Sequence, residues 1–217
     1  YQNDPSQTED VLLGYKDFQG YLKDQSYFNC IVGRVCGRIS NASFDLHSKQ
    51  YSLFANNGPH HLHGGKEGFN KKVWEITNLH KTPNCLKCDL KYNSPHLEEG
   101  YPGQLECKAT YSLTNNNEFI INFEITSDQD TIVNLTNHNY WNFHGHNSMY
   151  KNIADHRVKI NAQFYCESDD DLIPTGKLLS VQETKFNFQD YTNLNENNLQ
   201  NNGIDTCYCV SDNVFLD

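Results

Sequence analysis

The chain has 217 residues and a formal net charge of −10, with 17 Lys and Arg against 27 Asp and Glu. This acidic balance argues against nucleic acid or an anionic membrane as a partner, because a phosphate backbone is bound by clustered Lys and Arg. The sequence contains no apolar run as long as a membrane span. The charge balance does not argue against neutral small molecules as ligands.

Alternation of apolar and polar residues predicts β-strands along most of the chain. In the first half, strands are expected over 30–35, 43–47, 50–54, 72–79 and 86–92. The clearest alternation follows in "LECKATYSL", 105–113, where Leu105, Cys107 and Ala109 share one face. The stretch "EFIINFEIT", 118–126, comes directly after "TNNN". Together they predict an antiparallel hairpin in which the asparagines form the turn.

Strands are also expected over 131–137, 156–161 and 207–211. Helical periodicity of any length is hard to find. The predicted fold class is therefore all-β, a large antiparallel β-sandwich. The Asn-rich stretch 192–203 lacks apolar periodicity, which indicates a long exposed loop. No internal repeat or domain boundary is evident, so residues 1–217 are predicted to form a single domain.

Eight cysteines would fit disulfides in a secreted protein, but most lie inside strand-like runs, where a thiol packs as a small apolar group. No signal-peptide pattern opens the chain. We therefore expect a reducing cytoplasm. Cys85 and Cys88 form a C-x-x-C, yet they lie in opposite strand phases and no second pair exists, which argues against structural zinc. Cys207 and Cys209 share one face, which indicates core packing.

Several other polar groups invite a catalytic interpretation. Glu98 and Glu99 could suggest glycosidase carboxylates, but neighbours on an extended chain face opposite ways, so a polar turn before Gly100 is favoured. Arg34 is expected to be solvated. Arg38 follows Gly37, which leaves room for a ligand and weakly favours a site. The sequence contains no G-x-S-x-G nucleophile motif.

Acid–base chemistry by histidine remains, and "NLTNHNYWNFHG", 134–145, is the strongest candidate for it. The segment begins as an apolar strand and then places His138 between two asparagines, just before Tyr140 and Trp141. Imidazole exchanges a proton near neutral pH. Aromatic faces suit the C–H face of a sugar, while Asn, Arg and Asp meet its hydroxyls. The segment therefore indicates acid–base chemistry by His138 in a polar, aromatic-rich cleft that suits a sugar.

The chain resembles the aldose 1-epimerase (galactose mutarotase) family. The similarity begins at "EDVLLGYKDFQGYL", residue 9, and reaches the last residues, so it covers nearly the whole chain. It rests on five motifs in the same order: "NNGPHHLHGGKEGFNKKVWEI", "EEGYPG", "VNLTNHNYWNFHG", "LIPTGKLLSV" and "GIDTCYCV". The resemblance implies a β-sandwich that interconverts the α and β anomers of free aldoses, such as galactose and glucose, without cofactor or metal.

The resemblance also implies roles for single residues. His138 would protonate the ring oxygen, and His63 of "LHGG" would hydrogen-bond the sugar and polarise the same region. Arg38 would contact sugar hydroxyls, and Asp205 of "GID" would do so from the opposite side. Tyr140 and Trp141 would wall the cleft.

Two departures from the family pattern matter. Gly37 stands where the family commonly has Asn, so one hydroxyl contact is expected to be absent or replaced by water. The family's general base is a glutamate in a strand well beyond the "GID" aspartate, and no glutamate here matches it. We therefore expect an interior fragment, incomplete at both ends and inactive alone. The alternatives are a non-catalytic carbohydrate-binding or regulatory protein, and a relative acting on hexose 6-phosphates, for which a further basic cluster is missing.

Overall fold

The computed structural model describes residues 9–145, 153–194 and 203–210. Its contacts group into two compact units. Unit 2 is Tyr15–Asn139, and unit 1 combines Tyr1–Gly14 with Tyr140–Asp217. Each unit is described by itself, and the single domain expected from the sequence stays a prediction.

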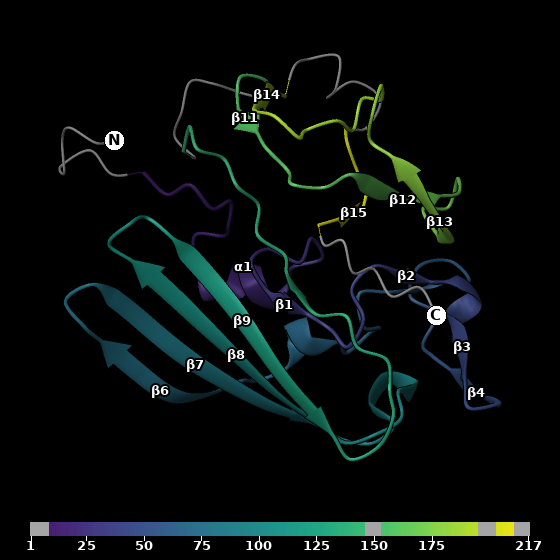
Figure 1. Ribbon diagram of the computed structural model, residues 1–217. Helices are drawn as coiled ribbons and strands as arrows, with labels where there is room; N and C mark the ends of the chain where they lie inside the picture. Colours follow the sequence, from purple (N-terminus) through teal and green to yellow (C-terminus); the bar gives the residue numbers. More distant parts are fainter. Residues whose placement is uncertain (1–8, 146–152, 195–202, 211–217) are drawn as a thin grey trace. The chain divides into compact units, whose positions relative to one another are not determined.

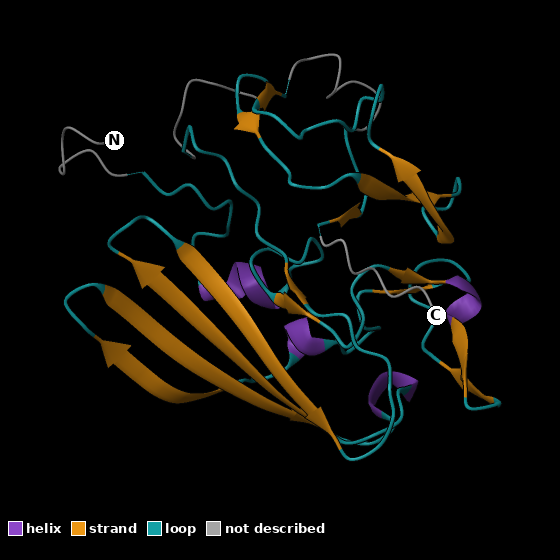
Figure 2. Cartoon of the chain, viewed as in Figure 1, coloured by secondary structure: helices purple, strands orange, loops and turns teal. Residues whose placement is uncertain are grey.

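Strands dominate both units, and the helices are short (Figure 2). The helical elements are α1 (Phe18–Leu22) and the 3₁₀ turns η1 (Ser40–Ala42), η2 (Phe69–Lys71) and η3 (Glu98–Gly100). In unit 2 the strands are β1 (Ile31–Val32), β2 (Arg38–Ile39), β3 (Ser43–Leu46), β4 (Lys49–Ser52), β5 (His61–Leu62), β6 (Glu75–Lys81), β7 (Cys85–Ser94), β8 (Leu105–Thr114), β9 (Phe119–Ser127) and β10 (Thr136–Asn137). In unit 1 they are β11 (Arg157–Val158), β12 (Phe164–Ser168), β13 (Pro174–Ser180), β14 (Thr192–Asn193) and β15 (Tyr208–Cys209). Among these described residues no helix is long and apolar enough to cross a membrane.

A four-stranded antiparallel sheet in the order β6-β7-β8-β9 is the largest element of unit 2 (Figure 1). Its β8–β9 hairpin pairs Leu113 with Phe119. Thr114 N–H donates to the Glu118 carbonyl across 3.0 Å, and Asn117 has a positive φ of 61°. The hairpin and its asparagine turn are therefore confirmed. Smaller antiparallel pairs join β1 to β10, β2 to β5 and β3 to β4.

The core of unit 2 lies against this sheet. Leu105, Cys107 and Ala109 of β8 are fully buried and pack with Ile31 and Phe69. These three are the alternating residues that the sequence assigned to one face, so the period-two pattern predicted the buried side of β8 correctly. Towards the far end the pattern fails, since Leu113 is 51% exposed.

Arg34 is buried, so the prediction of a solvated side chain was wrong. Its exposed fraction is 2%. Its guanidinium donates to Ser94 Oγ at 2.9 Å and to the carbonyls of Ser94, Pro95, Pro102 and Gly103 at 2.7–3.1 Å. Five donated hydrogen bonds replace the water that the guanidinium loses. The arginine thereby joins β7 to the segment before β8.

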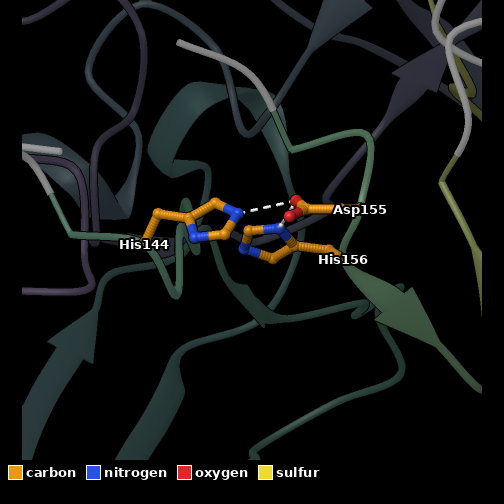
Figure 3. Close-up of side chains that lie close together, drawn as sticks. All are labelled: His144, Asp155 and His156. Atoms are coloured by element: carbon orange, nitrogen blue, oxygen red, sulfur yellow. Dashed lines mark hydrogen bonds and ion pairs between the residues drawn. The ribbon is translucent and has the colours of Figure 1, made fainter. Parts of the chain in front are cut away.

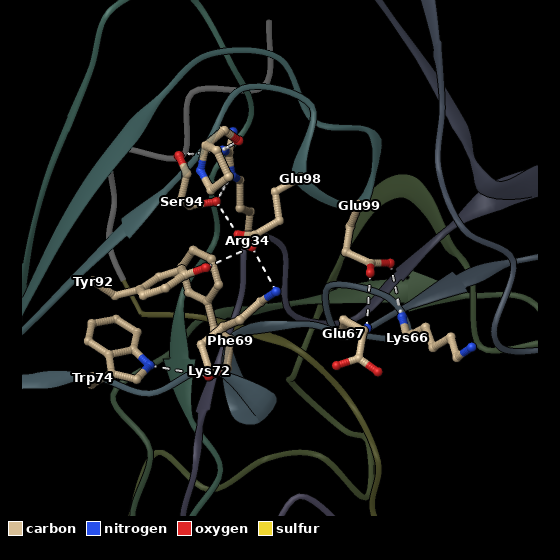
Figure 4. A network of polar contacts seen from close by, with 11 residues as sticks. Arg34, Lys66, Glu67, Phe69, Lys72, Trp74, Tyr92, Ser94, Glu98 and Glu99 are labelled. Atoms are coloured by element: carbon tan, nitrogen blue, oxygen red, sulfur yellow. Dashed lines mark hydrogen bonds and ion pairs between the residues drawn. The ribbon is translucent and has the colours of Figure 1, made fainter.

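Glu98 and Glu99 form the polar turn that the sequence favours, and both also brace the fold (Figure 4). Glu98 accepts hydrogen bonds from Ser94 Oγ and from Tyr92 OH at 2.7 Å, and it pairs with Lys72 Nζ at 2.7 Å. Burial alone would raise the pKa of Glu98, but these donors outweigh it and hold the pKa below its usual range. The Glu99 carboxylate accepts two backbone N–H groups, of residues 66 and 67.

Unit 1 contains a three-stranded antiparallel sheet in the order β13-β12-β15 and a two-stranded pair, β11 with β14. Ala162, Ile173, Val181 and Phe188 are its buried apolar residues within the described segments. The sequence predicted strands near β11 and β15 but not β12 or β13. Of the predicted loop 192–203, Thr192–Asn193 forms β14, while 195–202 lie outside the described residues.

Candidate active site

His138 directly follows β10, and its backbone N–H and carbonyl are both hydrogen-bonded to the neighbouring residues 29–30. The β1–β10 pair aligns Ile31 with Asn137. One step further, His138 N–H donates to the Cys30 carbonyl across 2.9 Å, and the His138 carbonyl accepts the Asn29 N–H across 3.0 Å. The apolar strand that the sequence indicated therefore fixes the backbone from which the imidazole projects.

His63 follows β5 in a left-handed conformation, with φ of 53°. Its backbone N–H donates to the Gly37 carbonyl at 3.0 Å, and its Nδ1 accepts the Gly37 N–H at 3.1 Å. Since Nδ1 accepts a hydrogen bond, a neutral His63 carries its proton on Nε2. Gly64 has φ of 86°, and a Cβ there would overlap the Gly33 carbonyl oxygen. This explains the first glycine after the histidine in "LHGG".

The rings of His63 and His138 meet edge to face, with centroids 5.4 Å apart and planes at 87°. Tyr27 completes the cluster, 4.8 Å from the His63 ring and 6.0 Å from the His138 ring. We call Tyr27, His63 and His138 the ring cluster. Burial raises the pKa of Tyr27, with a smaller contribution from the neighbouring Cys30, so its hydroxyl keeps its proton at neutral pH. The imidazole rings of His63 and His138 therefore lie next to each other in unit 2.

Tyr27 was missed by the sequence analysis, and its position depends on Asp24. The Asp24 carboxylate accepts N–H groups from Ser26 at 2.9 Å and Phe28 at 3.0 Å, and the Tyr15 hydroxyl at 2.9 Å. These bonds close the turn on both sides of Tyr27, which has φ of 59°. Burial alone would raise the pKa of Asp24, but the three donors outweigh it and the pKa lies below its usual value. The Asp-x-x-Tyr spacing is too common to have identified this turn.

Arg38 is positioned by the same two strands as His63. In the β2–β5 pair Arg38 lies opposite Leu62, so the next step along each strand brings Gly37 to His63. Arg38 Nε donates to Asn57 Oδ1 at 3.0 Å, and this hydrogen bond orients the guanidinium group. Its other N–H groups form a fork suited to hydroxyl or carboxylate oxygens. The same two strands therefore carry Arg38 and His63, and a shared role of the two side chains in one site stays a prediction.

Tyr140, Trp141 and Asp205 belong to unit 1. Leu13 N–H donates to the Tyr140 carbonyl at 2.9 Å, and a bridge pairs Leu12 with Trp141. Trp141 is 42% exposed, and its ring stacks on Phe143 with centroids 5.8 Å apart. Asp205 is exposed and lies shortly before β15. The grouping of these three with the ring cluster stays a prediction.

His144, Asp155 and His156 form a further polar cluster in unit 1 (Figure 3). His144 Nε2 and Asp155 Oδ1 are 2.6 Å apart, and His156 Nδ1 lies 3.6 Å from the same oxygen. The hydrogen bond with His144 lowers the pKa of Asp155. His156 Nε2 accepts the Phe143 N–H at 2.9 Å, so a neutral His156 carries its proton on Nδ1. That nitrogen has no lone pair for a metal, and the cluster fits a hydrogen-bonded brace better than a cation site.

The comparisons with known proteins agree with the motifs. The family model described as aldose 1-epimerase matches residues 1–217. The chain belongs to the aldose 1-epimerase family. Galactose mutarotase from Bos taurus is 42% identical over 206 residues, which are 93% of this chain and 57% of that protein. Aldose 1-epimerase from Haemophilus influenzae is 37% identical over 180 residues, 83% of this chain and 51% of that protein.

Solved structures of the family match the fold as well. The GalM/aldose epimerase homologue from C. elegans has a TM-score of 0.76 and 33% identity, over 86% of this chain and 55% of that one. Galactose 1-epimerase from Lactobacillus acidophilus has a TM-score of 0.75 and 28% identity, over 85% and 53%. The all-β fold of the mutarotase type is thus confirmed. The chain spans 57% of the length of its bovine relative.

Proposed function

We propose that the protein containing this chain is an aldose 1-epimerase, which interconverts the anomers of free aldoses by acid–base ring opening. The observation that carries the proposal is the edge-to-face contact of His63 with His138, in which Gly37 sets the His63 tautomer. A ring-opening catalyst must give a proton to the ring oxygen and take it back when the ring closes. Imidazole does both near neutral pH.

In this mechanism His138 is the general acid. It protonates the ring oxygen while a general base removes the proton of the anomeric hydroxyl, and the C1–O5 bond breaks to give the open-chain aldehyde. Rotation about C1–C2 and closure on the other face return each proton to its origin. The Nε2–H of His63 donates a hydrogen bond to the same region of the sugar, which stabilises charge on the oxygen as the bond breaks.

Substrate binding is assigned to Arg38, Tyr140, Trp141 and Asp205, together with the two histidines. Arg38 and Asp205 would hold hydroxyl groups, because a guanidinium donates hydrogen bonds and a carboxylate accepts them. Tyr140 and Trp141 would cover the C–H face of the ring. We propose neutral hexoses such as galactose and glucose as substrates, and the net charge of −10 suits neutral ligands better than nucleic acid or an anionic membrane surface.

The general base that the resemblance implies is a glutamate with no counterpart among these 217 residues. A positioned acid or base contributes about 10²- to 10⁴-fold to a rate. We therefore expect a polypeptide of these residues alone to be nearly inactive. Because all eight cysteines are free thiols, we also propose a reducing compartment, the cytoplasm, as the site of action.

Polarimetry of freshly dissolved α-galactose tests the proposed activity and the expected inactivity of the 217 residues alone. A family-length protein that contains this chain is expected to accelerate mutarotation far above the buffer rate, whereas the 217-residue polypeptide is not. Galactose binding without turnover by the family-length protein would favour a carbohydrate-binding or regulatory role instead. Fast mutarotation by the 217 residues alone would overturn the expected need for the glutamate.

A further inference from the structure

The loop that carries His63 is held by side chains that the candidate site has not yet involved. This loop, residues 62–67, has the sequence "LHGGKE" and is here called the histidine loop. His63 stands in it with φ of 53°, a left-handed conformation that a residue with a side chain keeps only where its surroundings hold it. The placement of the imidazole therefore depends on what holds the backbone on each side.

Asn56 holds the histidine loop close to His63. Its Oδ1 accepts the Leu62 N–H at 2.8 Å, and its Nδ2 donates to the carbonyls of Leu62 at 2.9 Å and of Gly65 at 3.2 Å. One carboxamide thus satisfies backbone groups in the residue just before His63 and in the residue two positions after it. A carboxylate of the same shape has no donor for either carbonyl.

Glu99 holds the other end of the histidine loop (Figure 4). Its carboxylate accepts the Lys66 N–H and the Glu67 N–H, each at 3.0 Å. Gly65 has φ of 98°, and a Cβ there would overlap Glu99 Oε2. The second glycine of "LHGG" therefore lets the carboxylate approach the loop.

A role in stability alone would not require these particular targets. The groups that Asn56 and Glu99 bind lie immediately before His63 and two to four residues after it. His63 itself is joined to Gly37 through its N–H and its Nδ1. A rotation of the backbone on either side of His63 would carry Nδ1 away from the Gly37 N–H, which is the bond that sets the tautomer.

We propose that Asn56 and Glu99 are positioning residues for mutarotation, which act through His63. By holding residues 62 and 65–67, they keep Nδ1 on the Gly37 N–H and leave the proton on Nε2. The inference rests on the proposed function, in which that Nε2–H donates a hydrogen bond to the sugar. Neither residue touches the ring of His63 in this role, and each acts only through the loop backbone.

Isosteric substitutions in a family-length protein that contains this chain test the proposal. Asn56→Asp places a carboxylate oxygen against two carbonyls, and Glu99→Gln places an NH₂ group against one of two N–H groups. We expect each substitution to lower kcat about tenfold or more and to change KM less than about threefold, because a misplaced Nε2–H loses stabilisation of the transition state. Polarimetry over a range of galactose concentrations measures both constants.

Matched controls make the same chemical changes at exposed positions of the large sheet. Asn93→Asp lies on β7 and Glu106→Gln on β8, and both side chains are exposed. Both controls are expected to keep the kcat and KM of the parent. Urea denaturation of all four variants shows that each is folded under the assay conditions and records any loss of stability separately from the loss of rate.

The tautomer of His63 provides a readout that does not need catalysis. In ¹⁵N–¹H correlation spectra of the histidine rings, the His63 signals are identified by their absence from the spectrum of His63→Gln. We expect the parent protein to carry the His63 proton on Nε2, whereas Asn56→Asp and Glu99→Gln show a mixture of both tautomers. The two control variants are expected to give the parental signals.

Two results separate this proposal from the proposed function. If Asn56→Asp and Glu99→Gln lose stability but keep kcat and the parental tautomer, both residues only brace the fold and the positioning role is overturned. If the parent protein itself does not accelerate mutarotation, the proposed function fails, and the tautomer alone decides whether the two residues position His63. Unchanged His63 signals in both variants, or a parent with the proton on Nδ1, would then overturn the inference.

Discussion

Gly37 and His63 are joined by two hydrogen bonds, both of which use the backbone of Gly37. The Gly37 N–H donates to His63 Nδ1 at 3.1 Å, and the Gly37 carbonyl accepts the His63 N–H at 3.0 Å. The first bond sets the tautomer of the imidazole, and the second sets its place beside β2. Because Arg38 follows Gly37 directly, the same pair of strands positions both a proton-bearing nitrogen and a guanidinium.

The first prediction concerns His138, the proposed acid. In a family-length protein that contains this chain, His138→Gln is expected to lower kcat about 10²- to 10⁴-fold, because glutamine can hydrogen-bond the ring oxygen but cannot protonate it. The rate is measured by polarimetry at saturating galactose. His80→Gln, on the exposed edge strand β6, is the control and is expected to leave kcat unchanged. A kcat within about threefold of the parent would remove His138 from the proposed chemistry.

The second prediction concerns Asp24 as a positioning residue for the ring cluster. Asp24→Asn turns one acceptor oxygen into an NH₂ donor, which then faces either the Phe28 N–H or the Ser26 N–H together with the Tyr15 hydroxyl. The expected loss is about 1.5–3 kcal/mol in the free energy of unfolding, together with a raised KM as Tyr27 shifts. Urea denaturation and substrate titration measure the two effects. Asp45→Asn on β3, with an exposed side chain, is the control.

The pH dependence of the Asp24 contribution has a defined sign. The folded pKa of Asp24 is lowered from 3.8, so the carboxylate stabilises the folded state fully above that pH. The contribution is lost as the pH falls below 3.8 through the folded pKa. In Asp24→Asn this part of the acid sensitivity should disappear. If the parent and the variant lose stability identically through this range, Asp24 does not brace the turn.

The sequence predicted β7, β8 and β9 well because they carry a period-two pattern over many residues. It missed the seven-residue strand β13. In β8 the buried Leu105, Cys107 and Ala109 are the residues that the pattern selected. Two-residue strands such as β2 and β5 contain too few positions for any period. The alternation pattern therefore could not predict the contact between Gly37 and His63, which organises the candidate site.

Single polar residues were harder to place than strands. Arg34 was expected in solvent, because nothing in the residues around it shows that four carbonyl groups converge there. Tyr27 was missed because its position depends on a left-handed turn closed by Asp24. The pairing of His63 with His138 came from the family resemblance, since the 74 residues between them carry no sign of their contact.

The third prediction concerns the buried Arg34. Arg34→Lys keeps the positive charge but replaces the five-donor fork with a single ammonium group. Several of the carbonyls around it are then left buried without a donor, at about 1–3 kcal/mol for each unsatisfied group. We expect a loss of at least about 3 kcal/mol in the free energy of unfolding. The midpoint of urea denaturation measures it, with exposed Arg157→Lys as the matched control.

A small effect of Arg34→Lys, below about 1 kcal/mol, would mean that water enters and satisfies the carbonyls. The same experiment in Glu98→Gln separates the two halves of the network. Glu98 binds Lys72 and Tyr92 rather than the guanidinium, but Glu98 and Arg34 share one partner, Ser94. Because of this shared partner, the stability losses caused by the two substitutions should add only in part.

The fourth prediction concerns His61, which is fully buried. Tyr101 OH donates to its Nε2 at 2.6 Å, and its Nδ1 faces the Phe54 carbonyl at 2.8 Å, so the neutral ring satisfies both partners. Burial lowers the pKa of His61 below 6.5. Between the folded pKa and 6.5 the unfolded chain therefore binds a proton that the folded chain does not, and stability rises with pH across that window.

Urea denaturation at a series of pH values from neutrality to below 6.5 measures this slope. His61→Gln is expected to be less stable at neutral pH but to lose the part of the slope that lies just below 6.5, while exposed His80→Gln keeps it. Tyr101→Phe leaves Nε2 buried without a donor, so it should cost about 1–3 kcal/mol at neutral pH. In that variant protonation of Nε2 no longer displaces a hydroxyl donor, and the slope below 6.5 should become shallower. An unchanged slope in His61→Gln would assign the pH dependence to other groups, because a glutamine side chain has no proton to gain in this range.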